Sequence, residues 1–354
     1  MHTEILTTPN GEQYPIITGS GLLQTVGAAL AKRTAPCRAM IVSDKNVAPL
    51  YLQTVEESLA DAGFSAAHFV VPTGENSKSV RVLGDLLEAM CEAHMTRTDL
   101  AVALGGGIVG DLTGFAAGCY LRGIRFVQLP TTLLAAVDAS VGGKTAVNLL
   151  HGKNLAGLFH QPIGVYCDTD TLKTLSDTER RSGAAEAIKT GILGDPELFE
   201  IYENGEPDGQ SEEIIVRSVL YKAKIVSEDP LEKGVRKLLN LGHTPAHAIE
   251  ILSDFAVPHG YAVAIGTAMM TRAAKKHGMI SEADADRIIR TLKRTGLPTG
   301  TQYSAKEMAD IALLDKKAAG RSITVILPER IGCCRMEKIP LEALEALFAE
   351  GLED

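Results

Sequence analysis

The chain has 354 residues, of which 45% are hydrophobic and 22% charged, and its formal net charge is −9. This length exceeds the usual limit for one hydrophobic core, so two domains are expected. The chain is acidic overall and contains no long run of lysine or arginine. Both features argue against a general affinity for nucleic acid or an anionic membrane. An anionic substrate would therefore need a locally basic pocket.

The start of the chain and its cysteines indicate where the protein works. No basic segment followed by an apolar stretch opens the sequence, and no apolar run approaches the roughly 20 residues that span a bilayer. The six cysteines are scattered, with only Cys333 and Cys334 adjacent and no CxxC pair. This usage is typical of reduced thiols rather than of a disulfide framework or a cysteine-based zinc site. We expect a soluble, cytoplasmic protein.

Short apolar runs alternate with helical patterns through the first half of the chain. Helical stretches at 50–62 and 80–94 are long enough to connect parallel strands. This alternation predicts an α/β domain with a mostly parallel, Rossmann-like sheet. The predicted strands are 39–42, 67–71, 100–104, 125–129 and 164–167.

The pattern changes to longer helical periodicity from about Thr171. Helices are expected at 211–227, 262–277 and 281–295, and a β-like segment, 322–327, is too short to change the assignment. The sequence therefore predicts a largely α-helical second domain, with domains at 1–172 and 173–354.

A glycine-rich turn follows the predicted strand that ends at Leu104. Residues 105–111 read GGGIVGD and lead into a helical pattern at 112–119. Such a turn lets the backbone and the helix N-terminus approach a phosphate. The acidic residue expected about 20 positions later in a dinucleotide site is missing, because Pro130, Thr131 and Thr132 stand there. A tight turn packed for steric reasons remains the alternative.

Small and polar residues crowd the stretch 130–154. Asp138, Lys144, Lys153 and Asn154 in this stretch are candidates to line a pocket for a ribose or a carboxylate. A single lysine is usually a solvated side chain, so the prediction depends on their concentration in one Gly-rich stretch.

Three of the nine histidines, His243, His247 and His259, lie close together in the sequence. His243 and His247 are four residues apart and share one face of a helix, provided the helix begins near Pro245. Glu186 lies among small apolar residues, where an unpaired carboxylate is costly, so a partner is implied. Two histidines and this carboxylate would leave one position of a zinc-like ion open for catalysis. The spacing does not decide which two histidines bind, and an exposed Glu186 paired with Lys189 is the alternative.

Together these motifs resemble those of the 3-dehydroquinate synthase family, within the sugar-phosphate cyclase superfamily. The resemblance covers most of the chain, and the order of the motifs makes it specific. The motifs are GGGIVGDLTGFAA, YLRG, QLPTTLLAAVDASVGGKTAVN, HGKN, AAEAIKTGIL, LNLGHTPAHAIE, HGYAVAIG and DKK.

The resemblance implies an enzyme that cyclises an acidic sugar phosphate with NAD and a divalent metal. It implies that Glu186, His243 and His259 hold the ion, zinc or cobalt, while His247 faces the substrate. The implied NAD-binding residues, with Asp44 at the adenosine ribose, are Asp44, Glu75, Lys78, Gly106, Gly107, Ile108, Asp111, Thr131, Thr132, Asp138, Lys144 and Lys153. The implied substrate-binding residues are Asp138, Lys144, Asn154, Lys189, Lys222, Arg236, Asn240, His247, Lys316 and Lys317.

The resemblance also implies a homodimer, because Arg122 is expected to reach the substrate of a neighbouring subunit. Two positions depart from the commoner family pattern: Ala246 stands in place of glycine and Tyr261 in place of an acidic residue. Three other functions fit parts of the pattern: another sugar-phosphate cyclase, an iron-type NAD-dependent polyol dehydrogenase, and a catalytically silent NAD- or metal-binding regulator.

Overall fold

The computed structural model describes residues 1–8, 11–205, 207–316 and 321–352, and the side chains of 314–316 lie outside the described part. The chain divides into two compact units, a first unit of Met1–Leu175 and a second unit of Ser176–Asp354. No helix in the described ranges is long and apolar enough to cross a membrane.

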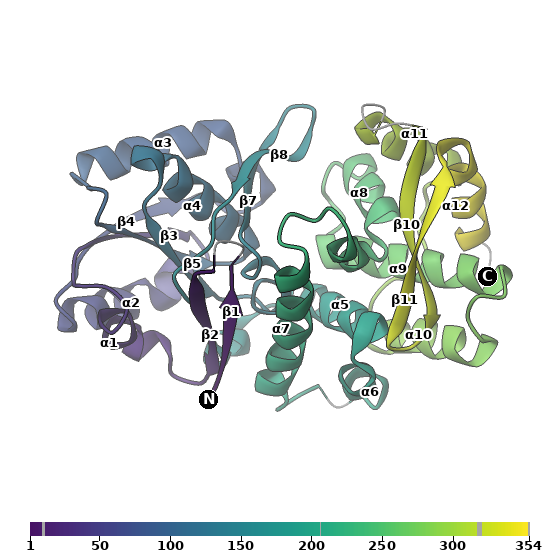
Figure 1. The fold of residues 1–354 in the computed structure, drawn as a ribbon, viewed down its shortest axis with the longest axis horizontal. Coiled ribbons are helices and arrows are strands. Elements are labelled where there is room, and N and C mark those ends of the chain that lie inside the picture. The colour runs from purple at the N-terminus through teal and green to yellow at the C-terminus, as the bar shows by residue number, and fades with distance from the viewer. Residues whose placement is uncertain (9–10, 206, 317–320, 353–354) are drawn as a thin grey trace. The chain divides into compact units, whose positions relative to one another are not determined.

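A seven-stranded sheet forms the centre of the first unit (Figure 1). Its order is β1-β2-β9-β6-β5-β3-β4, antiparallel between β1 and β2 and parallel elsewhere. The predicted α/β fold with a mostly parallel sheet is confirmed, since the five predicted strands are β3, β4, β5, β6 and β9. The strands are β1 (His2–Thr7), β2 (Gln13–Gly19), β3 (Arg38–Asp44), β4 (Ser65–Val71), β5 (Leu100–Gly105), β6 (Arg125–Pro130) and β9 (Val165–Asp168).

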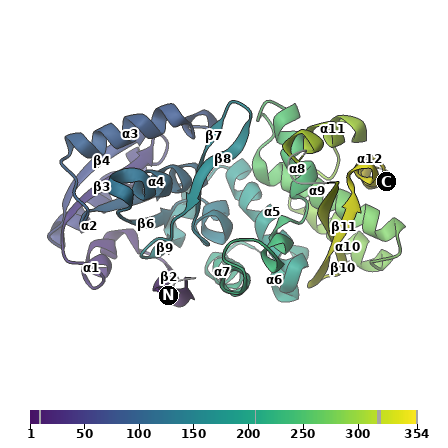
Figure 2. The same cartoon turned by 45° about the horizontal axis from the view of Figure 1, so that its top comes forward.

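Helices pack on both faces of this sheet (Figure 2). Successive side chains of a strand point to opposite faces. Ile41 of β3 therefore joins one core with side chains of α1 and α2, while Val42 joins another with side chains of α3 and α4. The helices and short turns are α1 (Val26–Ala31), α2 (Ala48–Asp61), α3 (Val80–Glu92), α4 (Gly107–Cys119), η1 (Leu23–Thr25), η2 (Glu75–Ser77), η3 (Tyr120–Arg122), η4 (Ala135–Ala139) and η5 (Thr169–Thr174).

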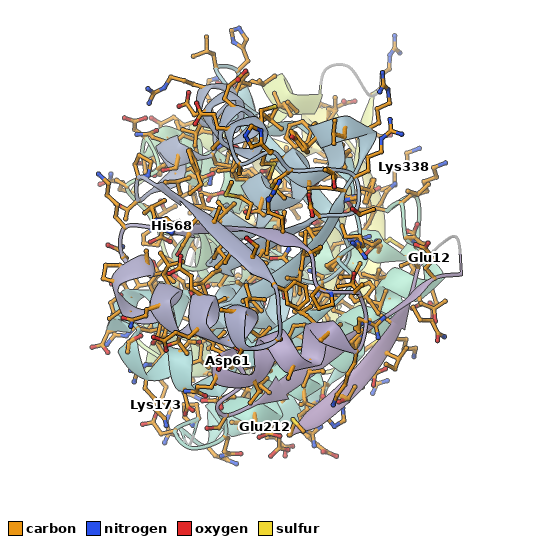
Figure 3. All side chains as sticks on the ribbon, turned by 90° about the vertical axis from the view of Figure 1, so that its left-hand side faces the viewer. Glu12, Asp61, His68, Lys173, Glu212 and Lys338 are labelled. Carbon is orange, nitrogen blue, oxygen red and sulfur yellow. The ribbon has the colours of Figure 1, made fainter. Side chains whose placement is uncertain are left out.

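Polar side chains lie at the edge of the sheet at β4. His68 of β4 is exposed (Figure 3), and its Nδ1 lies 2.7 Å from Oε1 of Glu56 on α2.

A hairpin of β7 (Lys144–Leu149) and β8 (Gly152–Phe159) packs against α4 in the first unit. It was not predicted, because its strands are short and follow a stretch rich in small and polar residues. A bridge between Ser79 and Asn148 ties the hairpin to the start of α3.

The second unit is largely helical, as predicted, and β10 and β11 form an antiparallel hairpin in it. Serine side chains cap two of its helices, since the Oγ atoms of Ser176 and Ser281 accept backbone hydrogen bonds at the first turns of α5 and α10. Its elements are α5 (Asp177–Gly194), α6 (Pro196–Glu203), α7 (Ser211–Glu228), η6 (Val235–Asn240), α8 (His243–Leu252), α9 (His259–Lys276), α10 (Glu282–Arg294), α11 (Ala305–Lys316), β10 (Ser322–Arg330), β11 (Cys333–Pro340), η7 (Leu341–Ala343) and α12 (Leu344–Leu352).

Candidate metal centre and cofactor site

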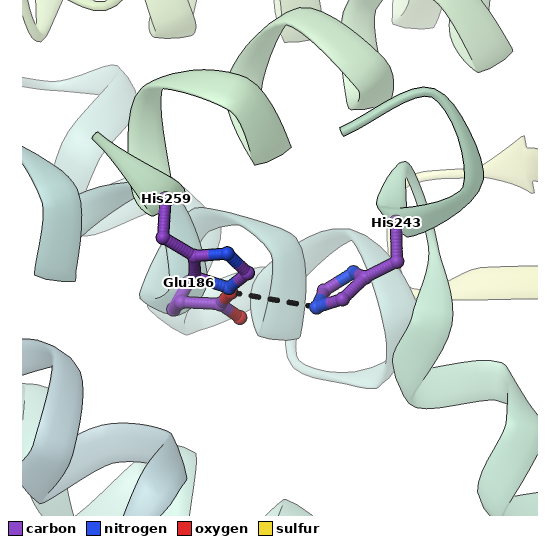
Figure 4. A group of neighbouring side chains, drawn as sticks. All are labelled: Glu186, His243 and His259. Atoms are coloured by element: carbon purple, nitrogen blue, oxygen red, sulfur yellow. Dashed lines mark ion pairs between the residues drawn. The ribbon is translucent and has the colours of Figure 1, made fainter. Parts of the chain in front are cut away.

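Three helices of the second unit bring Glu186, His243 and His259 together (Figure 4). Glu186 lies within α5, whereas His243 and His259 are the first residues of α8 and α9. Each side chain offers one ligand atom, and these atoms all lie within 4.8 Å of one another. The predicted helix start is confirmed, with Pro245 in the first turn of α8.

Two glycines allow these helices to approach one another. Gly242 precedes α8 with a φ of 76°, in the left-handed region that L side chains rarely adopt. Gly260, directly after His259, faces the backbone of α5: a Cβ there would lie 2.2 Å from the carbonyl oxygen of Ser182. The N-terminus of α9 can therefore reach Glu186, one turn further along α5.

Hydrogen bonds at Nδ1 orient the two imidazoles. His243 Nδ1 lies 3.1 Å from the carbonyl oxygen of Leu241, and His259 Nδ1 lies 3.2 Å from Oε1 of Glu250. Each ring thereby turns its Nε2 toward Glu186, at 3.8 Å for His243 and 3.3 Å for His259. Nε2 is the nitrogen left available to an ion in both rings.

Glu186 is buried, with 1% of its surface exposed. The Lys189 ammonium lies 2.5 Å from its Oε2, so the implied partner exists and the exposed alternative is wrong. Burial raises the pKa of Glu186, but Lys189 and the two histidines outweigh it and hold the pKa well below the usual range. The other oxygen, Oε1, has no hydrogen-bond partner among the described residues and faces Nε2 of His259 at 3.3 Å and Nε2 of His243 at 3.8 Å. A buried, ionised carboxylate with this deficit fits a cation.

The surroundings shift the pKa values of the two histidines in opposite directions. Burial, together with the nearby Lys189, lowers the pKa of His243 to about 3. Burial also disfavours the charged form of His259, but its contacts with Glu186 and Glu250 raise its pKa to about 10. The ring of His259 thus lies between two carboxylates, with Nε2 facing Glu186 and Nδ1 facing Glu250. One carboxylate and two imidazoles suit zinc or cobalt and leave a coordination position open.

Other predicted residues of the second unit surround this group on neighbouring elements. Lys189, Lys222 and Arg236 are buried on α5, α7 and η6, which pack against one another. Arg236 Nη1 donates to the carbonyl of Pro230 at 2.6 Å. His247 is exposed on α8, and its ring centroid lies 5.7 Å from that of His243.

Asn240 of η6 is held by a residue that was not predicted. Its Nδ2 donates to Oε1 of Glu232 at 2.7 Å. Lys317 and the side chain of Lys316 lie outside the described residues.

In the first unit, the glycine-rich turn joins β5 to α4, which begins at Gly107 and Ile108 after Gly106. The amide of Thr131 donates to the carbonyl of Gly105 at 3.0 Å, which places Thr131 beside this turn. Its hydroxyl is buried and has no hydrogen-bond partner among the described residues. An unsatisfied hydroxyl beside a helix N-terminus fits a polar ligand such as a nucleotide phosphate.

A polar network joins several predicted residues of the first unit. The Lys78 ammonium contacts Asp111 of α4 and Asn154 of β8. Asn148 of β7 was not predicted, yet it donates to Glu75 Oε1 at 2.7 Å and accepts from the Asn154 amide at 2.9 Å. Lys153 Nζ also lies 3.5 Å from this Glu75 oxygen. No single-residue signal in the sequence distinguishes Asn148 from other strand residues.

The other predicted residues of the first unit lie in turns and at the ends of strands. Asp44 ends β3, and its Oδ1 accepts from the amides of the next turn at 2.8 and 3.1 Å. The Thr132 hydroxyl accepts from the amide of Ala135 at 3.1 Å, and Asp138 lies on η4. Lys144 is exposed at the start of β7, and Arg122 is exposed with a φ of 69°.

Comparison with known protein families covers both units. The family descriptions "3-dehydroquinate synthase N-terminal" and "3-dehydroquinate synthase C-terminal" match residues 68–182 and 183–318. A 3-dehydroquinate synthase from Rhizobium leguminosarum bv. trifolii is 43% identical over 339 residues, which cover 92% of this chain and 90% of that protein.

Two solved structures share the fold. A 2-deoxy-scyllo-inosose synthase, complexed with carbaglucose-6-phosphate, NAD+ and Co2+, matches with a TM-score of 0.88 at 24% identity, over 99% of this chain and 100% of that one. A 2-epi-5-epi-valiolone synthase from Streptomyces hygroscopicus subsp. jinggangensis, with NAD+ and Zn2+ bound, matches with a TM-score of 0.87 at 26% identity, over 96% of each chain.

Proposed function

The chain belongs to the 3-dehydroquinate synthase family, and we propose that it converts 3-deoxy-D-arabino-heptulosonate 7-phosphate to 3-dehydroquinate and phosphate. It does so with NAD and a divalent metal, zinc or cobalt, as part of aromatic amino-acid biosynthesis. The observation that carries this proposal is the convergence of Glu186, His243 and His259 in a chain that matches the family over nearly its whole length.

The two predicted domains, 1–172 and 173–354, bind different ligands in this proposal. The first binds NAD at the turn after β5 and along the Glu75 and Lys78 network, supported by the unsatisfied Thr131 hydroxyl. The second holds the metal and most of the cations for the substrate, supported by the buried Lys189, Lys222 and Arg236. These cations supply the local positive charge that an anionic substrate needs in an acidic protein.

When bound, NAD accepts and returns a hydride, and the divalent ion acidifies a substrate hydroxyl by Lewis acidity. The residues of the chain orient the substrate and stabilise charge. Lys222 and Arg236 bind its anionic groups, so charge that develops as phosphate leaves is already matched. His247 is exposed within one turn of His243, where it can move a proton to or from the substrate.

The chain acts as a cytoplasmic homodimer in this proposal. Arg122 then contributes to the site of the second copy. The β7–β8 hairpin supports self-association, because Leu150, Leu155 and Phe159 expose 102%, 52% and 46% of their surfaces. The absence of disulfides among the six cysteines fits a reducing compartment.

The proposed reaction is tested by incubating the protein with the heptulosonate phosphate, a catalytic amount of NAD and zinc or cobalt. We expect inorganic phosphate and a carbocyclic product, with no net NADH. Phosphate release only from sedoheptulose 7-phosphate or glucose 6-phosphate would indicate another cyclase of the superfamily. Net NADH formation from a polyol would indicate a dehydrogenase.

The metal assignment is tested by replacing His259 with alanine. We expect metal content and activity to be lost together, because the ion loses one of three protein ligands. His277→Ala is the control, since His277 pairs with Glu350 on the surface and should retain both. Full activity of a metal-free His259→Ala protein would refute the assignment.

A further inference from the structure

Glu250 is a buried carboxylate behind the metal group. It lies on α8, seven residues after His243 and three after His247, so the three side chains share one side of the helix. Only 2% of its surface is exposed. Burying a carboxylate is costly unless it meets a hydrogen-bond donor or a positive charge.

The turn after α8 returns the chain to this carboxylate. The Phe255 amide and the Ser253 hydroxyl both donate to the Glu250 carbonyl, at 2.8 and 3.0 Å. The Ser253 hydroxyl in turn accepts from the amide of Val257 at 3.2 Å. Two residues later α9 begins with His259, whose Nδ1 lies 3.2 Å from Glu250 Oε1. The local backbone therefore holds the imidazole against the carboxylate.

This contact fixes which nitrogen of His259 is available to an ion. When Nδ1–H donates to Glu250, the lone pair of a neutral ring is on Nε2, which lies 3.3 Å from Glu186 Oε1. His243 is oriented in the same way, but by the neutral carbonyl of Leu241. The two imidazoles thus differ at Nδ1, where His259 meets a carboxylate and His243 meets a neutral carbonyl.

We infer that Glu250 is a positioning residue for the metal centre, which orients His259, increases its strength as a ligand, and adds a second negative charge near the ion. This inference rests on the metal-binding role given to Glu186, His243 and His259 in the proposed function. Loss of such a carboxylate behind a histidine ligand typically lowers metal affinity by about 10- to 100-fold. The effect reaches the substrate through His259 and the ion, not through a contact of Glu250 with the substrate.

The test compares Glu250→Gln with the unmodified chain. Glutamine keeps the size and one acceptor oxygen but removes the charge. Zinc and cobalt affinities are measured on metal-free protein by competition with a chromophoric chelator, and the cobalt-loaded proteins are compared by visible absorption. We expect the affinity to fall at least 10-fold and the cobalt bands to shift. NAD affinity should remain unchanged, because the NAD-binding residues lie in the first unit.

Glu282→Gln is the matched control, since Glu282 pairs with Lys275 on the surface and is expected to leave metal affinity unchanged. Glu250→Ala gives a second variant, and Glu250→Gln still decides the question if the alanine variant does not fold. Metal affinity of Glu250→Gln within twofold of the unmodified chain would overturn the inference. If the unmodified chain binds metal but does not release phosphate from any sugar phosphate, the proposed function fails while the metal measurements still judge Glu250.

Discussion

The contact between α9 and α5 at Gly260 can be tested by a single methyl group. In Gly260→Ala, the new Cβ would lie 2.2 Å from the carbonyl oxygen and 2.4 Å from the Cα of Ser182. Both are backbone atoms of α5, so no side-chain rotation relieves the clash. One helix must move by about 1 Å to restore ordinary contact distances in a close-packed interior.

The expected loss of stability follows from two opposing effects. Overpacking of this kind costs up to about 3 kcal/mol, whereas replacing glycine by alanine within a helix gains about 0.5–1 kcal/mol. The free energy of unfolding should therefore fall by about 2 kcal/mol. Ser182 is one turn before Glu186, and metal sites tolerate misplacement of only about 0.5 Å. Metal affinity should consequently fall as well.

Urea unfolding of the metal-free protein and chelator competition measure the two effects. Gly84→Ala in α3 is the control, because no atom lies within 4 Å of its Cβ position. It should raise the free energy of unfolding by about 0.5–1 kcal/mol and leave metal affinity unchanged. If Gly260→Ala proved as stable and as tight for metal as the unmodified chain, the close approach would not be what positions His259.

Other substitutions test the first unit and the surface. Asn148→Ala should weaken NAD binding, because Glu75 loses its 2.7 Å hydrogen bond. It should also raise the KM for the sugar phosphate without changing metal content. Unchanged NAD affinity would contradict the role of this network. Thr131→Val should raise the free energy of unfolding by about 1 kcal/mol, because it removes an unsatisfied buried hydroxyl. It should also weaken NAD binding. An unchanged Kd for NAD would place the cofactor elsewhere. Hydrogen bonds from Arg287 outweigh the effect of burial and lower the pKa of Glu203 below 4.5. The ionised carboxylate therefore stabilises the fold above about pH 4.5, and this stabilisation is lost as the pH falls through the lowered pKa. Urea unfolding of Glu203→Gln between about pH 5 and 3 should show a flatter pH dependence, and an equal slope would count against it.

Local patterns in the sequence indicated the fold class of each unit. The apolar runs at β3, β5 and β6 are continuous rather than alternating because each strand is buried on both faces. The intervening helical stretches are long enough to connect parallel strands. The turn at Gly106 and the helix start near Pro245 were likewise predictable, because turn residues and helix periodicity act over a few neighbouring positions.

Which side chains meet was decided by tertiary structure. Spacing alone could not separate His243 from His247, because both lie on one helix face and only the packing of α5 and α9 shows which one approaches Glu186. Glu250 and Asn148 gave no signal of their own, since their partners come from separate elements. Periodicity in the sequence indicates which face of a helix or strand is buried. The side chains that bind an ion must instead lie at set distances from one another, and those distances are fixed only when the helices and strands pack together.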